Sequence, residues 1–220
     1  MEESDFLMAD DTKLEFDIGD FTLSLDLEDN PNRYIKPKFH AKPIKVDYAN
    51  AKTLAKQIKL FPGEQIHGIV KGDFIFGDFI EALIYEKDII VENMYLSTLG
   101  MSQENIDSLA GMLKNGRIKK LTLILSNYFY SHEKYRLMKY LLDECDIDNK
   151  LDVLILRNHT KICLMEIANI RLVLSGSSNL RSSDCFEQFI LQESQELYMF
   201  YQEWFELNRQ YSIINQEVDK

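Results

Sequence analysis

The chain has 220 residues, 45% of them hydrophobic and 11% aromatic, which is enough to bury the core of one domain. It contains no apolar run of 18 residues and no basic, apolar secretory signal at its N-terminus, so we predict a cytoplasmic protein that does not span a membrane. Cys145, Cys163 and Cys185 stand far apart without a CxxC pair, so we expect reduced thiols.

The first 30 residues form an acidic leader that carries most of the net charge of −11. Because the rest of the chain is nearly neutral, this charge is weak evidence against a nucleic-acid substrate. Apolar residues alternate with polar ones at 14–18 and at 21–27, which predicts extended strands and allows a β-hairpin. The leader is either a solvated tail or an arm that competes with an anionic substrate or recruits a protein partner.

Residues 31–47 form a basic linker interrupted by Pro31, Pro37 and Pro43. Its basic residues are interleaved with aromatic ones, a composition that suits a phosphate backbone. A surface linker that pairs with the acidic leader explains the same composition and is the simpler interpretation.

From residue 48 the pattern becomes regular and predicts a single α/β domain over 48–220. Helices are expected at about 48–59, 77–86, 102–116 and 132–145, and buried strands at about 65–71, 88–96, 121–125 and 152–157. Strands that alternate with helices predict a mixed, largely parallel sheet flanked by helices.

After residue 158 the runs HTKICLME and IRLVLSGSS indicate two adjacent strands in a hairpin, and FEQFILQ indicates a third. A final helix carries an apolar stripe that we expect to face the core. The stripe consists of Leu197, Phe200, Tyr201, Trp204 and Leu207.

His159 and Lys161 are the first candidate site residues. Residues two apart in a strand project from the same face, so the imidazole and the ammonium are expected side by side. This pair suits chemistry on a phosphate, because the imidazole attacks or transfers a proton while the lysine neutralises phosphoryl oxygens.

The turn that ends the neighbouring strand supplies further candidates. Gly176 lets the backbone approach a ligand closely, and Ser177 and Asn179 offer neutral donors to the same phosphate. We assign Gly176 and Ser178 to substrate binding. Glu187 begins the next strand, where a carboxylate is placed to hold a ring nitrogen of His159 as the third member of a triad does.

HTK at 159–161 followed by GSSN at 176–179 resembles the HxK…GSxN signature of the phospholipase D superfamily, specifically its single-repeat, nuclease-like members. The resemblance is specific over about 159–190 and elsewhere extends only to element order. It implies a phospholipase D-like fold and a metal-independent phosphodiesterase that forms a phosphohistidine at His159. In that scheme the phosphate is bound by Lys161 and Asn179, with Ser177 assisting and Glu187 orienting the histidine.

The pattern departs from the family at Glu166, which stands where the family's motif has an aspartate, generally treated as structural. The interval from Glu166 to Gly176 is also longer than usual, which a longer hairpin would absorb.

The single motif copy has a further implication, because the family's active site needs two. The resemblance therefore implies a homodimer with one composite site across a twofold axis. We predict no cofactor and no metal, since no His, Cys, Asp and Glu cluster has metal-ligand spacing. Of the isolated histidines His40, His67 and His132, the last is the best candidate for substrate binding, because it follows a polar, aromatic stretch at a strand end.

Three functions remain open from the sequence. The first is a nuclease acting on DNA or RNA, with no membrane partner, of the kind found in mobile elements or defence systems. The second is a binding or regulatory module that holds phosphates without turnover, which the acidic leader and Glu166 support. The third is an ordinary α/β domain unrelated to the family.

Overall fold

The computed structural model describes residues 51–59, 65–72, 75–180 and 183–213, together with the backbone of three strands in the first 46 residues. The chain divides into two units, Met1–Lys38 and Phe39–Lys220. In the first unit, β1 (Lys13–Ile18) and β2 (Phe21–Asp26) pair antiparallel, at the positions where the alternation predicts strands. The linker around His40 lies outside the described residues.

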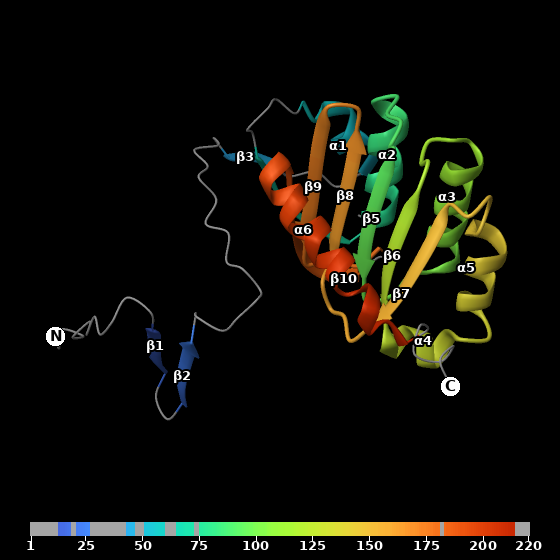
Figure 1. Ribbon diagram of the computed structural model, residues 1–220. Helices are drawn as coiled ribbons and strands as arrows, with labels where there is room; N and C mark the ends of the chain where they lie inside the picture. Colours follow the sequence, from blue (N-terminus) through green and yellow to red (C-terminus); the bar gives the residue numbers. More distant parts are fainter. Residues whose placement is uncertain are drawn as a thin grey trace. The chain divides into compact units, whose positions relative to one another are not determined.

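The second unit is organised by one mixed sheet. Its strands are β3 (Pro43–Val46), β4 (Gln65–Gly72), β5 (Asn93–Thr98), β6 (Leu121–Ser126), β7 (Leu151–Leu156), β8 (Ile162–Ile167), β9 (Ile170–Gly176) and β10 (Ser183–Glu193). The eight strands lie in the order β3-β4-β10-β9-β8-β5-β6-β7 (Figure 1). The segment 43–46, assigned above to the linker, is thus a strand at one side of the sheet.

The expectation of a largely parallel sheet is wrong. Only β3–β4, β5–β6 and β6–β7 are parallel, and the other four neighbouring pairs are antiparallel. The reason is that β8, β9 and β10 follow one another as antiparallel neighbours, and they insert between the parallel strands on either side.

Helices cover both faces of the sheet, unequally. They are α1 (Ala51–Gln57), α2 (Phe76–Glu86), α3 (Gln103–Lys114), α4 (Asn127–Glu133), α5 (Leu137–Cys145) and α6 (Gln195–Leu207), followed by a 3-10 turn, η1 (Arg209–Tyr211). Four of them, α1, α2, α3 and α5, pack their buried faces into the larger core. The opposite face is covered by α6 (Figure 1).

Each central strand contributes side chains to both cores, because successive side chains point to opposite faces of the sheet. On β5, Met94 and Leu96 join the larger core, and Tyr95 between them joins the smaller one. On β6, Leu123 and Leu125 do the same around Ile124. These two central strands are therefore buried on both faces.

Local signals explain where α3 begins and ends. Ser102 and Asn105 form a capping box, in which the Ser102 amide donates to Asn105 Oδ1 at 3.0 Å and the Asn105 amide donates to Ser102 Oγ at 3.4 Å. Gly116 follows the helix with a φ of +69°, a conformation that glycine adopts without strain. Both ends agree with the sequence prediction.

The apolar stripe of α6 differs from the expected one. Tyr198 and Phe205 are its buried residues, and both rings pack edge-on against Tyr95, whereas Leu207 is 54% exposed. Leu197, Tyr201 and Trp204 pack partly buried against the same core. The face that contacts the sheet is thus rotated from the one that the pattern predicted.

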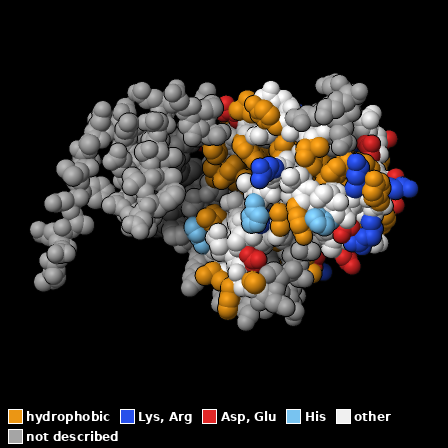
Figure 2. All heavy atoms as spheres, turned by 90° about the horizontal axis from the view of Figure 1, so that it is seen from below, with side chains coloured by type: hydrophobic (Ala, Val, Ile, Leu, Met, Phe, Trp, Pro, Cys, Tyr) orange, Lys and Arg blue, Asp and Glu red, His pale blue; other side chains and the backbone are white. Residues whose placement is uncertain are grey.

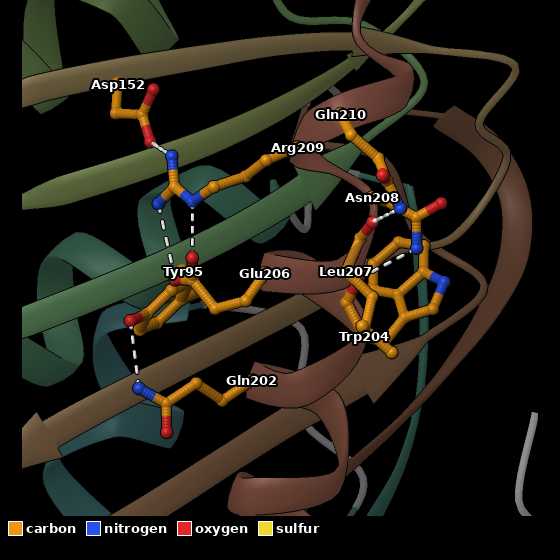
Figure 3. A network of polar contacts seen from close by, with 9 residues as sticks. All are labelled: Tyr95, Asp152, Gln202, Trp204, Glu206, Leu207, Asn208, Arg209 and Gln210. Carbon is orange, nitrogen blue, oxygen red and sulfur yellow. Dashed lines mark hydrogen bonds and ion pairs between the residues drawn. The ribbon is translucent and has the colours of Figure 1, made fainter.

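Polar contacts fasten the end of α6 to the sheet (Figure 3). Gln202 Nε2 donates to the hydroxyl of Tyr95 at 2.9 Å. Arg209, which begins η1, donates to Asp152 on β7 and to Glu206 on α6. Among the described helices, none combines the length and the apolar character needed to cross a bilayer.

Candidate active site

The candidate residues lie together at one edge of the sheet, because β8 starts where its antiparallel neighbours β5 and β9 end. Ile162 at the start of β8 pairs with Ser97 near the end of β5 and with Ser175 near the end of β9. The segment His159–Lys161 therefore lies beside the turn Gly176–Asn179. Figure 2 looks onto this edge and shows histidine side chains there, among hydrophobic, basic and acidic ones.

His159 and Lys161 contact each other directly. Lys161 Nζ donates to the His159 carbonyl oxygen at 2.6 Å and lies 2.9 Å from Nδ1 of the imidazole. A protonated amine can only donate, so Nδ1 accepts and the ring proton is carried by Nε2. The imidazole is exposed, whereas Lys161 is only 7% exposed.

The environment of Lys161 disfavours its charge. Burial lowers the pKa of the Lys161 ammonium, and the nearby negative charge of Glu187 partly opposes this. A buried cation with a lowered pKa is a common feature of functional sites, because such a charge gains strongly from an anionic ligand.

Asn179 is held in one defined orientation. Its Oδ1 accepts from the amide of Leu99 at 3.2 Å and from the Thr98 hydroxyl at 3.5 Å. A backbone N–H cannot accept, so the oxygen of the carboxamide must face it, and Nδ2 projects away as a donor. The end of β5 thus orients an N–H donor from the neighbouring turn.

Gly176, at the end of β9, packs closely against the backbone of β10. A Cβ at this position would lie 2.2 Å from the carbonyl oxygen of Gln188, which is backbone and has no freedom to move aside. The glycine is therefore required by the contact between β9 and β10, independently of any ligand.

Ser177 and Glu187 bind each other instead of the groups predicted for them. The Ser177 hydroxyl donates to the Glu187 carboxylate and accepts from the amide of Gln188 at 3.0 Å. Across the described residues, no hydrogen bond joins Glu187 to His159, so the expected His–Glu contact is not present. Ser178, in contrast, is buried, and its hydroxyl has no partner among the described groups.

Residues that the sequence analysis did not single out support the loop before β8. Asn158 Nδ2 donates to the carbonyl oxygen of Thr98 at 3.2 Å, and its Oδ1 accepts from the amide and the hydroxyl of Thr160 at 3.0 and 2.7 Å. The Thr160 hydroxyl also lies 2.6 Å from that of Ser97. An asparagine just beyond the end of a strand, two residues before a threonine, signals such a turn and would have identified it.

His132 lies on a cavity that Asn179 also lines. The cavity has a volume of about 590 Å³, and its wall includes the loop after β5 and the segment from α4 into α5. Residues on this wall include Ser102, Tyr128, His132, Arg136 and Asn179. The structure thus brings two of the predicted residues, His132 and Asn179, to one space.

Glu166 lies at the far end of β8 from Lys161. It pairs with Arg171 at 2.5 Å and accepts from Asn93 Nδ2 at 2.6 Å. These contacts tie β8 to β9 and β5, so the glutamate at the position where the phospholipase D motif has an aspartate holds strands together. In the part of the chain that the structure describes, no three His, Cys, Asp or Glu residues are grouped to hold a metal ion.

No protein-family model matches the sequence, and neither does any curated protein. Among solved structures, the chain matches the archaeal chromatin protein TrmBL2, whose structure shows a novel mode of DNA binding, with a TM-score of 0.46 and 12% identity over 66% of this chain and 52% of that one. It matches polyphosphate kinase from Porphyromonas gingivalis with a TM-score of 0.47 and 14% identity, over 64% of this chain and 25% of that one. The match to phosphatidylserine synthase from Haemophilus influenzae has a TM-score of 0.45 and 16% identity, over 66% of this chain and 38% of that one.

The polyphosphate kinase and the phosphatidylserine synthase belong to the phospholipase D superfamily, which the motif of this chain resembles. This chain spans about half or less of the length of each of these three proteins. At such identities and TM-scores, the likeness carries no information about what this chain binds or catalyses. Its functional assignment therefore depends on the residues of the site.

Proposed function

We propose that this protein is a metal-independent phosphodiesterase, a nuclease that acts on DNA or RNA through a phosphohistidine at His159. The observation that carries the proposal is the arrangement at one sheet edge of an exposed imidazole, a buried ammonium in contact with it and an oriented amide donor. His159, Lys161 and Asn179 supply these three groups. A nucleophile beside fixed donors for a phosphoryl oxygen is what displacement at phosphorus requires.

The first chemical step follows from these groups. Nε2 of His159 attacks phosphorus, a P–N bond forms and the P–O bond to the leaving group breaks. Lys161 and the Nδ2 group of Asn179 stabilise the charge on the non-bridging oxygens. In the second step water attacks phosphorus, the P–N bond breaks and the free histidine returns.

Attack requires Nε2 to lose the proton that it carries in the contact described above. An incoming phosphate diester is an anion that competes with the imidazole for the Lys161 ammonium. When Lys161 turns to the phosphate, Nδ1 is released to take the proton, and Nε2 becomes the nucleophile. Substrate binding thus activates the histidine in this scheme.

The leaving oxygen needs a proton, and the chain has one HxK motif to supply it. We propose that His159 of the partner subunit donates this proton across a twofold axis and later accepts one from the attacking water. The exposed position of His159 at the sheet edge suits such a composite site.

The test is hydrolysis of bis-p-nitrophenyl phosphate in the presence of EDTA, comparing the wild type with His159→Asn, with the oligomeric state measured by sedimentation on the same samples. EDTA-resistant turnover by a dimer, lost in the variant, supports the proposal. Turnover by a monomer contradicts the composite site. His67→Asn is the matched control, because His67 lies on β4 and its ring contacts Gln65.

A second candidate is a binding module that holds phosphates without turnover. The observation in its favour is that Glu187 binds Ser177, and that no carboxylate among the described residues is hydrogen-bonded to His159 to orient it. Absence of hydrolysis by a well-folded dimer, on this substrate and then on DNA and RNA, would select this candidate. Deletion of residues 1–30 would then test whether the acidic leader competes for the site.

A further inference from the structure

The cavity beside Asn179 is lined on one side by two aromatic rings. Tyr128 and His132 stand one helical turn apart on α4, with ring centroids 4.2 Å apart and planes at 35°. Nδ1 of His132 donates to the carbonyl oxygen of Tyr128 at 2.8 Å, which fixes the imidazole. The Tyr128 side chain is 64% exposed, so a broad aromatic surface is accessible to a ligand.

The charges of the cavity do not favour a phosphate. Among its described lining residues Arg136 is the one full cation. Its Nε and Nη2 donate to the two carboxylate oxygens of Glu133 at 2.9 and 2.8 Å. Glu133 and Glu104 add two carboxylates to the wall, and hydrogen bonds hold the pKa of each below its usual range. An anion would meet this negative charge without an unpaired cation to offset it.

The same wall suits a nucleobase. Aromatic rings stack on the faces of bases, and carboxylate oxygens accept from the amino groups at base edges. Asn179 lines the cavity and also belongs to the phosphate-binding group proposed above, so a base in the cavity would belong to a nucleotide next to the reacting phosphate.

We propose that this cavity is a base-binding subsite and that the substrate is single-stranded nucleic acid. A base inside a duplex is stacked and paired, so its face is not available to Tyr128, whereas an unpaired base can turn into the cavity. The inference builds on the phosphodiesterase proposed above and narrows its substrate class.

Binding is measured separately from catalysis in the His159→Asn background. Fluorescence anisotropy with short labelled oligonucleotides, at fixed low salt, compares a single strand, its duplex and an abasic strand with the same phosphates. The single strand is expected to bind more tightly than either of the others. Tyr128→Ala should weaken its binding roughly 5- to 150-fold, the loss expected for one stacked base. Tyr128→Phe should retain the affinity.

Tyr85→Ala is the control for removal of a surface tyrosine. Tyr85 is 39% exposed near the end of α2, stacked under Arg117 and outside the cavity, so its removal should leave the affinity unchanged. The proposal is overturned by equal binding of duplex and single strand, by equal binding of the abasic strand, by no effect of Tyr128→Ala or by no binding at all. Failure of the phosphodiesterase proposal is separate, since it is absence of hydrolysis and leaves these affinities measurable.

Discussion

The two ends of the central strands are built differently. At the end that carries His159, side chains fasten one segment to the backbone of another: Asn158 to Thr98, and Ser126 and Asn179 to Leu99. At the opposite end, a cavity of about 690 Å³ is walled mainly by isoleucine and leucine side chains of α2, the loop before β5 and the β8–β9 turn.

Polar side chains that bind backbone groups contribute modestly to stability, about 0.5–1.5 kcal/mol each, but they fix geometry in a way that apolar contacts do not. Their concentration at one end indicates that this end is built to hold groups in position. The predictions below test this difference, starting from the largest expected effect.

Removal of an asparagine side chain should lower activity at the end that carries His159 and not at the opposite end. Asn179→Ala should lower kcat for a phosphodiester roughly 10²- to 10³-fold, because it removes a fixed donor to the charged transition state. Asn169→Ala, the same change at the exposed β8–β9 turn, should leave kcat unchanged. Steady-state kinetics of both variants measures this, and equal effects would show that the end carrying His159 has no special role.

Two glycine substitutions test whether the close packing of Gly176 against β10 contributes to the stability of the fold at the turn 176–179. Gly176→Ala should lower the free energy of unfolding by about 2 kcal/mol or more, because its Cβ would overlap the backbone of β10. Gly111→Ala, within α3, meets no neighbour and should stabilise by about 0.5–1 kcal/mol. Urea denaturation followed by circular dichroism gives both values, and a tolerated Gly176→Ala would contradict the contact.

The turn made by Asn158 should matter more for activity than for stability. Asn158→Ala removes hydrogen bonds to Thr98 and Thr160, with an expected loss of stability of about 1–2 kcal/mol. Because the loop also presents His159, kcat should fall more than KM changes. A variant with reduced stability and a wild-type kcat would show that the turn does not position the histidine.

The smallest expected effect is a shift in pH dependence. Lys161 must be protonated to bind the phosphate, and its lowered pKa places the alkaline fall of kcat/KM below the usual lysine value of about 10.4. Glu187 raises that pKa, so Glu187→Gln should move the fall to still lower pH. A shift in the opposite direction, or none, would contradict the assigned influence of Glu187.

The sequence alone predicted that the HxK and GSxN segments stand at neighbouring strand ends, because both patterns are local, and the structure places the two segments side by side. It did not predict the partners of Glu187, because a contact across two strands depends on register, and Ser177 proved to be the nearer group. The predominance of antiparallel pairs in the mixed sheet also escaped prediction, since single strand patterns do not reveal which strands become neighbours. Leu207 was misplaced for a similar reason, because two helical faces were apolar and packing selected the one with Tyr198.

The central claim is that His159 forms a bond to phosphorus, and intact-protein mass spectrometry of rapidly quenched reactions tests it most directly. Wild-type protein mixed with bis-p-nitrophenyl phosphate in EDTA, and quenched in alkaline denaturant, should carry one nitrophenyl phosphoryl group, which peptide mapping places on His159. His159→Asn should carry none. Turnover by the wild type with no adduct at any quench time, or with the adduct on another residue, would contradict the account.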